Sequence, residues 1–218
     1  AFTTPVSDSV LGYILAFSRR QPWMDAAMKN GEWKKIPGKT LSESTLGIIG
    51  IGNIGKAVTR RAKTFGMKVL GTDIIEIDHV FINESGIELT TLDILLSNSD
   101  FLSVNCDLNP TSEHLINALT LAQMKENAIL INTARGPIVD EIALIEALQA
   151  GKLGGAAMDV FEVEPLPEDS PLKKMDNVML APHNSNSSPA AWERVHWNTI
   201  KNLLDGLEID SSALKNDK

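Results

Sequence analysis

The 218-residue chain has little of what several classes of protein require. Its single cysteine, Cys106, leaves no disulfide framework and no cysteine cluster for a metal ion, and it favours a reducing compartment, so we expect a cytoplasmic protein without a metal site. No apolar run approaches the ~18–20 residues of a membrane-spanning helix, so we expect no membrane association. Lysine and arginine number 20 against 28 acidic residues, which leaves a net charge of −8 and no basic patch for nucleic acid.

Short apolar runs alternate with helical patterns from residue 45 onwards. The runs cover residues 46–49, 69–70, 101–104, 129–131, 156–158 and 178–180, and the clearest helical patterns cover residues 53–65, 140–149 and 189–207. Runs that are apolar throughout are typical of parallel strands buried on both faces. The alternation therefore predicts an α/β fold, with a doubly wound parallel sheet, helices on both faces and right-handed crossovers.

A glycine-rich segment, Gly50-Ile51-Gly52-Asn53-Ile54-Gly55, follows the first of these runs and opens a helical pattern. In that context the first glycine makes a tight turn, the second lets the backbone approach a pyrophosphate, and the third allows close packing of helix on strand. Asn53 and Ile54 lie where the helix N-terminus offers unpaired N–H groups and a positive dipole end. The segment predicts a dinucleotide-binding loop.

Asp73 follows the second apolar run, 18 residues after Gly55. This spacing is close to the ~20 residues typical of the carboxylate that binds an adenosine ribose. The carboxylate would accept a hydrogen bond from the 2′-hydroxyl and repel a 2′-phosphate, so the expected cofactor is NAD rather than NADP. The alternative is a glycine-rich turn beside a surface aspartate.

Three charged side chains, Arg135, Glu164 and His183, follow the last three apolar runs. If these runs are parallel strands, the three lie at carboxyl ends, where open α/β sheets bind their ligands. Hydride transfer between nicotinamide and a 2-hydroxy acid needs a cation for the substrate carboxylate, a proton donor for the carbonyl oxygen and a carboxylate beside the donor. Arg135, His183 and Glu164 suit these roles in that order. The alternative is an unrelated surface arginine, loop carboxylate and loop histidine.

At these residues the chain strongly resembles the D-isomer-specific 2-hydroxyacid dehydrogenase family, and its phosphoglycerate-dehydrogenase-like branch in particular. The likeness runs from about Thr4 to Leu207 and is carried by residues 46–55, 99–115, 132–141, 154–165 and 181–183. It implies a Rossmann-type NAD-binding domain that acts on a 2-hydroxy or 2-oxo acid. It also implies that Arg135 binds substrate, that His183 is the acid/base and that Glu164 partners it. Asp159 is implied near the nicotinamide carboxamide, Thr133 and Ala134 beside the cofactor, and Cys106 and Asp107 near the adenosine.

The chain departs from the family pattern in two places. After His183 the chain carries Asn184-Ser185-Asn186-Ser187-Ser188, where many relatives carry a glycine-rich or Gly-Ala step. This segment would give a more polar lining near the nicotinamide, and it leaves the identity of the substrate undetermined. We also expect this chain to lack most of the family's N-terminal substrate domain. We therefore expect the chain to be an excised piece of a longer enzyme rather than a natural fragment. It would bind NAD but convert substrate slowly or not at all, because half of the closing cleft is absent.

The expected organisation has three parts. Residues 1–40 would form N-terminal linking or interface helices, residues 41–207 the NAD-binding domain and residues 208–218 a polar tail. Residues 6–17 place apolar side chains at helical spacing, which a homodimer interface and packing on the same domain explain equally well.

The leading hypothesis is the coenzyme domain of an NAD-dependent dehydrogenase that transfers hydride to or from a D-2-hydroxy acid, with 3-phosphoglycerate as one candidate substrate. The alternative from another class is a non-catalytic NAD-sensing scaffold, like the co-repressors that share this fold. A generic nucleotide-binding regulatory domain would explain the glycine loop but would leave Arg135, Glu164 and His183 without a purpose.

Overall fold

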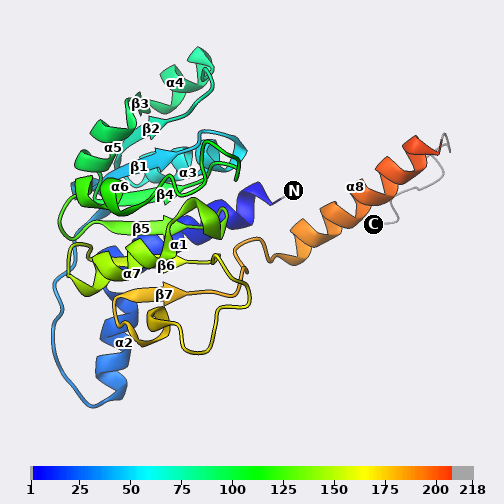
Figure 1. The fold of residues 1–218 in the computed structure, drawn as a ribbon. Helices are drawn as coiled ribbons and strands as arrows, with labels where there is room; N and C mark the ends of the chain where they lie inside the picture. Colours follow the sequence, from blue (N-terminus) through cyan, green and yellow to red (C-terminus); the bar gives the residue numbers. More distant parts are fainter. Residues whose placement is uncertain (1, 208–218) are drawn as a thin grey trace.

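A parallel sheet of seven strands forms the centre of the computed structural model, which describes residues 2–207 (Figure 1). The strand order is β3-β2-β1-β4-β5-β6-β7, so the chain reverses its direction of travel between β1 and β4. The predicted doubly wound parallel sheet is confirmed. The strands are β1 (Thr45–Ile49), β2 (Lys68–Thr72), β3 (Glu88–Leu89), β4 (Phe101–Val104), β5 (Ile129–Asn132), β6 (Gly155–Met158) and β7 (Val178–Leu180).

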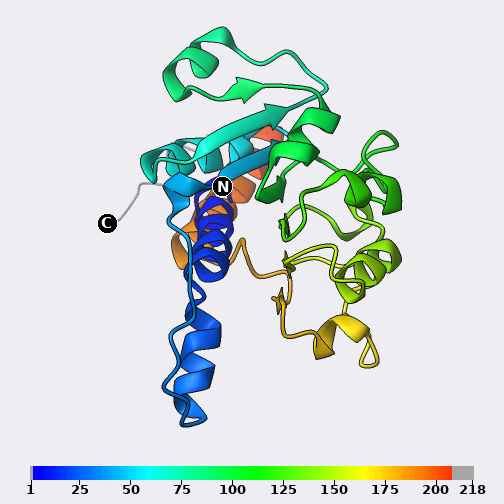
Figure 2. The same cartoon turned by 90° about the vertical axis from the view of Figure 1, so that its left-hand side faces the viewer.

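Helices cover both faces of the sheet, as predicted. Side chains of β5 alternate between two hydrophobic clusters, because Ile129 and Ile131 pack on one face and Leu130 on the other. Figure 2 shows α1 and α3 on one side of the sheet and α6 and α7 on the other. The helices of the two layers are α1 (Thr3–Arg19), α3 (Asn53–Thr64) and α4 (His79–Ser85), and then α5 (Leu92–Asn98), α6 (Ala118–Gln123) and α7 (Glu141–Gln149).

Helix α1 packs on its own domain through the apolar face found in the sequence. Val10 and Ile14 are fully buried in the cluster that also contains Val58 of α3. The helix begins at Thr3, and the Phe2 carbonyl accepts a hydrogen bond from the Val6 N–H at 3.2 Å. Packing on the same domain therefore explains why α1 has an apolar face. The domain boundary after residue 40 stays a prediction.

Two further helices lie at the periphery. Helix α2 (Gln21–Lys29) has no buried residue, and α8 (Pro189–Gly206), whose buried residue is Ala191, extends away from the sheet (Figure 1). Within residues 2–207, no helix combines the length and apolar character needed to cross a bilayer. The predicted tail of residues 208–218 lies outside the described part of the chain. Three short 3-10 helices complete the fold, η1 (Leu41–Glu43), η2 (Gly136–Ile138) and η3 (Pro171–Lys174).

Candidate active site

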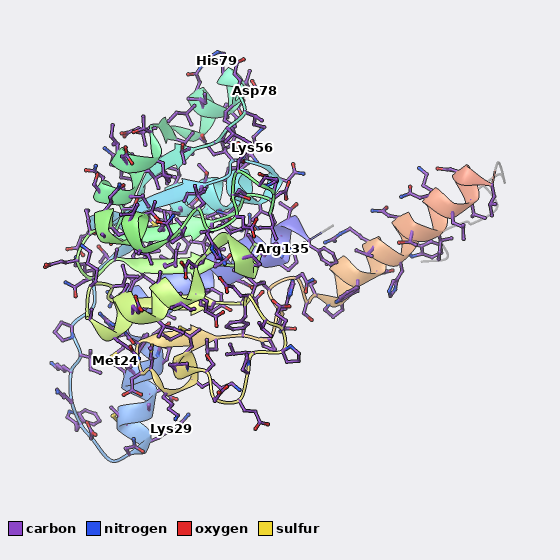
Figure 3. All side chains as sticks on the ribbon, in the orientation of Figure 1. Met24, Lys29, Lys56, Asp78, His79 and Arg135 are labelled. Carbon is purple, nitrogen blue, oxygen red and sulfur yellow. The ribbon has the colours of Figure 1, made fainter. Side chains whose placement is uncertain are left out.

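The predicted site residues gather at one edge of the sheet, where the strand arrows of Figure 1 end. Because all strand pairs are parallel, the carboxyl ends of β1, β2, β4, β5, β6 and β7 meet at this edge. Figure 3 labels Arg135 there. The residues that follow these strands are Gly50, Asp73, Cys106, Thr133, Asp159 and His183.

Three cavities lie along this edge. One, of about 490 Å³, is lined by Glu164, Leu180 and His183. Cys106 lines the other two. The smaller one, about 140 Å³, contains Gly50 and Asp73. The larger one, about 410 Å³, contains Arg135 and His183. Asp107, expected near the adenosine, lines the larger cavity and not the one with Asp73. The remaining lining of the larger cavity is Phe2, Val6, Ile54, Asn105, Leu108, Thr133, Ala134, Asp159, Ser185 and Asn186.

The glycine loop has the shape that a pyrophosphate requires. Gly50 has a φ of +86°, and a Cβ at this position would collide with the backbone of Cys106. A Cβ at Gly55 would collide with the Gly50 carbonyl oxygen, whereas a Cβ at Gly52 would have no other atom within 4 Å. Gly52 is also the N-cap of α3, where no side chain caps the helix. The loop therefore leaves open space beside uncapped N–H groups, and it fits the phosphates of a dinucleotide.

Asp73 connects the end of β2 to the glycine loop. One carboxylate oxygen accepts a hydrogen bond from the Ile51 N–H, and the other accepts one from the Ile75 N–H at 3.2 Å. A carboxylate has about four acceptor positions, so Asp73 retains capacity for a ribose hydroxyl. Burial raises the pKa of the neighbouring Cys106 thiol to about 11, and the charge of Asp73 adds to this effect. Cys106 is therefore a neutral thiol in the cavity wall.

His183 and Glu164 form a hydrogen-bonded pair. The His183 Nδ1 lies 2.9 Å from the Glu164 Oε2, and the Glu164 Oε1 accepts a hydrogen bond from the Phe161 N–H at 3.1 Å. Burial opposes ionisation of Glu164, but the His183 and Phe161 hydrogen bonds and the charges of His183 and Arg135 outweigh it and lower the pKa of Glu164. The carboxylate is therefore ionised at neutral pH, which fixes the orientation of the imidazole.

Arg135 stands on a loop that a buried asparagine holds in shape. Asn132 is fully buried, and its side chain donates to the Arg135 carbonyl at 2.9 Å and accepts from the Ala134 N–H at 3.0 Å. The Arg135 guanidinium is exposed, and its Nη1 donates to the Ala134 carbonyl at 2.6 Å. Next to it, a Cβ on Gly136 would collide with the Phe161 carbonyl, so the loops that carry Arg135 and Glu164 are in direct contact.

Asp159 anchors the segment that follows His183. The side chain is 1% exposed, and its two oxygens accept hydrogen bonds from the Asn184 N–H at 2.7 Å and the Ser185 N–H at 2.9 Å. The Asp159 carbonyl accepts from the His183 N–H at 2.8 Å, where His183 adopts a φ of +52°. This left-handed conformation is uncommon for a residue with a side chain, and the three bonds to Asp159 stabilise it.

Sequence reasoning did not single out several residues of this site. Asn105 and Asn132 had a usable signal, because each stands at or directly after the carboxyl end of a predicted strand. Tyr13 had none, since its position depends on how α1 packs, whereas Ser185 was expected only as part of the polar segment after His183. Within residues 2–207, no group of three His, Cys, Asp or Glu side chains is placed to hold a metal ion.

A second histidine–carboxylate pair lies near the first but lines none of these three cavities. The His114 Nε2 is 2.8 Å from the Glu162 Oε1, which also accepts a hydrogen bond from the Glu141 N–H at 3.2 Å. Burial and the charge of Glu162 raise the pKa of Glu141, partly offset by a hydrogen bond from the Glu162 N–H. His114 therefore ties together two surface segments, and a histidine–carboxylate pair alone does not distinguish the candidate site.

Comparison with known proteins identifies the family. The model of the D-isomer specific 2-hydroxyacid dehydrogenase NAD binding domain matches residues 11–185. The chain is 41% identical over 208 residues to a glyoxylate reductase of Thermofilum pendens, covering 93% of this chain and 61% of the relative. It is 42% identical over 194 residues to a D-3-phosphoglycerate dehydrogenase of Methanocaldococcus jannaschii, covering 88% of this chain and 37% of the relative.

The fold also matches solved structures. A D-lactate dehydrogenase from Aquifex aeolicus, complexed with NAD and lactic acid, superposes with a TM-score of 0.87 at 31% identity, over 94% of this chain and 67% of that one. Complexes with NADPH also occur among the similar structures, so the fold alone does not select between the two cofactors. The chain spans about three-fifths of the length of the glyoxylate reductase that it matches and less of the phosphoglycerate dehydrogenase.

Proposed function

Because the chain belongs to the D-isomer specific 2-hydroxyacid dehydrogenases and carries their NAD-binding domain, we propose that it serves an enzyme that oxidises or reduces a D-2-hydroxy/2-oxo acid pair. The observation that carries the proposal is the His183–Glu164 pair, with 2.9 Å between nitrogen and oxygen, beside a cavity that also contains Arg135. A nucleotide-binding regulatory domain would have no use for this arrangement at the carboxyl edge of the sheet.

The cofactor would lie along the two cavities that Cys106 lines. The loop from Gly50 to Gly55, with Asn53 and Ile54 at the start of α3, would hold the pyrophosphate. Asp73 would bind the adenosine ribose beside Cys106, and it favours NAD because a 2′-phosphate would meet a carboxylate. When bound, NAD supplies or accepts the hydride of the reaction. Thr133, Ala134, Asp107 and Asp159 would line its nicotinamide end.

His183 would handle the proton. Its Nδ1 faces Glu164, which leaves Nε2 to donate a proton to a carbonyl oxygen or to accept one from a hydroxyl. Glu164 remains ionised because its pKa is lowered, so it stabilises the imidazolium electrostatically and keeps the ring in one orientation. The same pair serves both directions of the reaction.

Arg135 would bind the substrate carboxylate. One guanidinium nitrogen donates to the Ala134 carbonyl, which fixes the side chain and leaves the other N–H donors for a bidentate contact. A positive charge beside the carbonyl would also polarise it during hydride transfer. The substrate class is a 2-hydroxy or 2-oxo acid, and 3-phosphoglycerate is one member among several that the named relatives act on.

The whole protein, assayed with NADH and a panel of 2-oxo acids, tests the proposal. Glyoxylate, hydroxypyruvate, pyruvate and 3-phosphohydroxypyruvate cover the range from small apolar to charged side groups. Oxidation of NADH that depends on one of these acids supports the proposal. Binding of NADH without turnover of any 2-oxo acid, under conditions where the protein is folded, would contradict it.

We also infer a cytoplasmic homodimer. Helix α2 has no buried residue, and Trp33 in the following loop is 88% exposed, so this region offers apolar surface to a second copy. A molar mass of one chain by light scattering, across the concentrations used for assay, would contradict the dimer.

A further inference from the structure

The segment around His114 runs alongside the loop that follows Arg135. The His114 N–H donates to the Pro137 carbonyl at 2.8 Å, and Pro137 is two positions after Arg135. The Ile116 N–H donates to the Ile138 carbonyl at 3.1 Å and continues the alignment. The backbone of the His114 segment therefore supports the loop that carries Arg135.

The ring of His114 reaches the other loop of the candidate site. Its Nε2 lies 2.8 Å from the Glu162 Oε1, and Glu162 is two positions before Glu164. The same oxygen accepts a hydrogen bond from the Glu141 N–H at 3.2 Å, and the Glu162 N–H donates to the Glu141 Oε2 at 3.3 Å. Glu162 is thus held both by His114 and by the start of α7. His114 therefore connects the loop of Arg135 to the loop of Glu164.

His114 makes these two contacts from an uncommon backbone conformation. Its φ is +46°, in the left-handed region that residues with a side chain rarely adopt. The Asn117 side chain donates to the His114 carbonyl at 2.8 Å, and the His114 N–H is bonded to Pro137, so both backbone polar groups have partners. Such conformations persist where surrounding contacts determine them, and they occur often at functional sites. The position of His114 is therefore fixed from both sides.

The separation between the two loops matters for a bound substrate. In a 2-oxo acid the carboxylate and the carbonyl group are joined directly, so covalent bonds fix the distance between them. Arg135 would hold the carboxylate, and His183, which Glu164 orients at 2.9 Å, would hold the carbonyl oxygen. A misplacement of about 1 Å between such groups lowers a rate by up to about 10²-fold. The loops must therefore keep Arg135 at a fixed distance from the His183–Glu164 pair.

We propose that His114 is a positioning residue, which sets the separation between Arg135 and the His183–Glu164 pair by joining their loops. The inference rests on the proposed function, because this separation matters only if one substrate contacts both groups. The His114 and Glu162 side chains are 48% and 30% exposed, so their pairing adds little to the overall stability. Its loss should therefore affect activity more than stability.

Kinetics of His114→Ala in the whole protein, at saturating NADH, test this role. The variant keeps the backbone bond to Pro137 but loses the ring. We expect kcat/KM for the 2-oxo acid to fall about 3- to 10-fold, because one hydrogen bond between the loops is lost. NADH affinity and the thermal midpoint should stay near those of the wild type. His114→Gln should restore kcat/KM to within about 2-fold, since a glutamine amide still donates to Glu162.

A second truncation guards against a backbone effect. Asparagine tolerates the left-handed conformation but is too short to reach Glu162. His114→Asn should therefore lose as much kcat/KM as His114→Ala. Wild-type kcat/KM in either truncated variant, or failure of His114→Gln to restore it, would overturn the assignment.

A double-mutant cycle separates positioning from a general structural effect. In the Arg135→Gln background no guanidinium holds the substrate carboxylate, so the distance between the loops loses its importance. His114→Ala should then lower kcat/KM by less than about a further 2-fold. An equal loss in both backgrounds would overturn the assignment, because it would show that His114 acts independently of Arg135.

His79→Ala is the matched control. The His79 Nε2 lies 3.8 Å from the Glu76 Oε1, in another histidine–carboxylate pair whose side chains are 84% and 90% exposed. Figure 3 shows His79 at the tip of α4, far from Arg135, so kcat/KM should equal that of the wild type. A loss as large as that of His114→Ala would count against the assignment. A wild type that turns over no 2-oxo acid would instead contradict the proposed function, so the two failures are distinguishable.

Discussion

The His183 Nδ1 lies 2.9 Å from the Glu164 Oε2, although the two residues are 19 positions apart and follow different strands. Adjacent parallel strands β6 and β7 bring them together, because both chain segments emerge at the same edge of the sheet. The Asp159 carbonyl and carboxylate then hold His183 and the residues after it. A short, oriented histidine–carboxylate pair is thus a direct product of the parallel topology.

His183→Gln should raise the pKa of Glu164 towards its usual value of 4.5, because the variant loses the charge of His183 and weakens its hydrogen bond. Carboxyl chemical shifts followed by NMR across pH 2–7 measure this. The lowered folded-state pKa stabilises the fold above about pH 4.5, and this contribution disappears as the pH falls through the folded value. The stability difference between wild type and variant should therefore narrow in acid. A Glu164 pKa that does not move would contradict the coupling.

Arg135→Lys and Arg135→Gln should form a graded series in the whole protein. Lysine keeps the charge but not the bidentate fork, and glutamine keeps neither. We expect kcat/KM for the 2-oxo acid to fall about 10-fold in the first and about 100-fold or more in the second, since a charged hydrogen bond contributes about 1.5–3 kcal/mol. NADH affinity should stay near that of the wild type. Wild-type kcat/KM in Arg135→Gln would contradict substrate binding by Arg135.

Asp73→Ser should shift cofactor preference towards NADPH. Removing the carboxylate removes both the ribose contact and the repulsion of a 2′-phosphate, so we expect the NADH/NADPH affinity ratio to fall about 10-fold or more. Asp78→Ser is a matched control, because Asp78 lies in the same β2–α4 segment but caps α4 through the Val80 N–H at 2.8 Å. Figure 3 shows Asp78 at the tip of α4, far from Arg135. An unchanged ratio in Asp73→Ser would show that another group selects the cofactor.

The sheet could be predicted from the sequence because strands buried on both faces are apolar without interruption. The residues 101–104 and 178–180 coincide with β4 and β7. Strand β3 was missed, since Glu88 and Leu89 are two exposed residues at the sheet edge. The short helices α4, α5 and α6 were missed as well, because six or seven residues are too few for a helical period to be recognised.

The sequence could predict only those site residues that stand in a recognisable motif or at a typical position after a strand. Gly50 and Asp73 follow strands at a typical spacing, and Arg135 and His183 lie in recognisable motifs. The buried position of Ser185 could not be predicted, because it depends on a hydrogen bond from its backbone N–H to Asp159, which is distant in sequence. The pairing of His114 with Glu162 has the same origin. The burial of a side chain and its choice of hydrogen-bond partner depend on the tertiary structure, so the local sequence does not reveal them.

The kcat of His183→Gln in the whole protein, measured together with its NADH dissociation constant, tests the central claim most directly. His114→Gln, which alters the other histidine–carboxylate pair, is the control. Removing the acid/base should lower kcat about 10²- to 10⁴-fold and leave NADH affinity within about 2-fold, because the proton is transferred by His183 while the cofactor is held elsewhere. The control should keep most of its kcat. A near-normal kcat in His183→Gln would contradict the account.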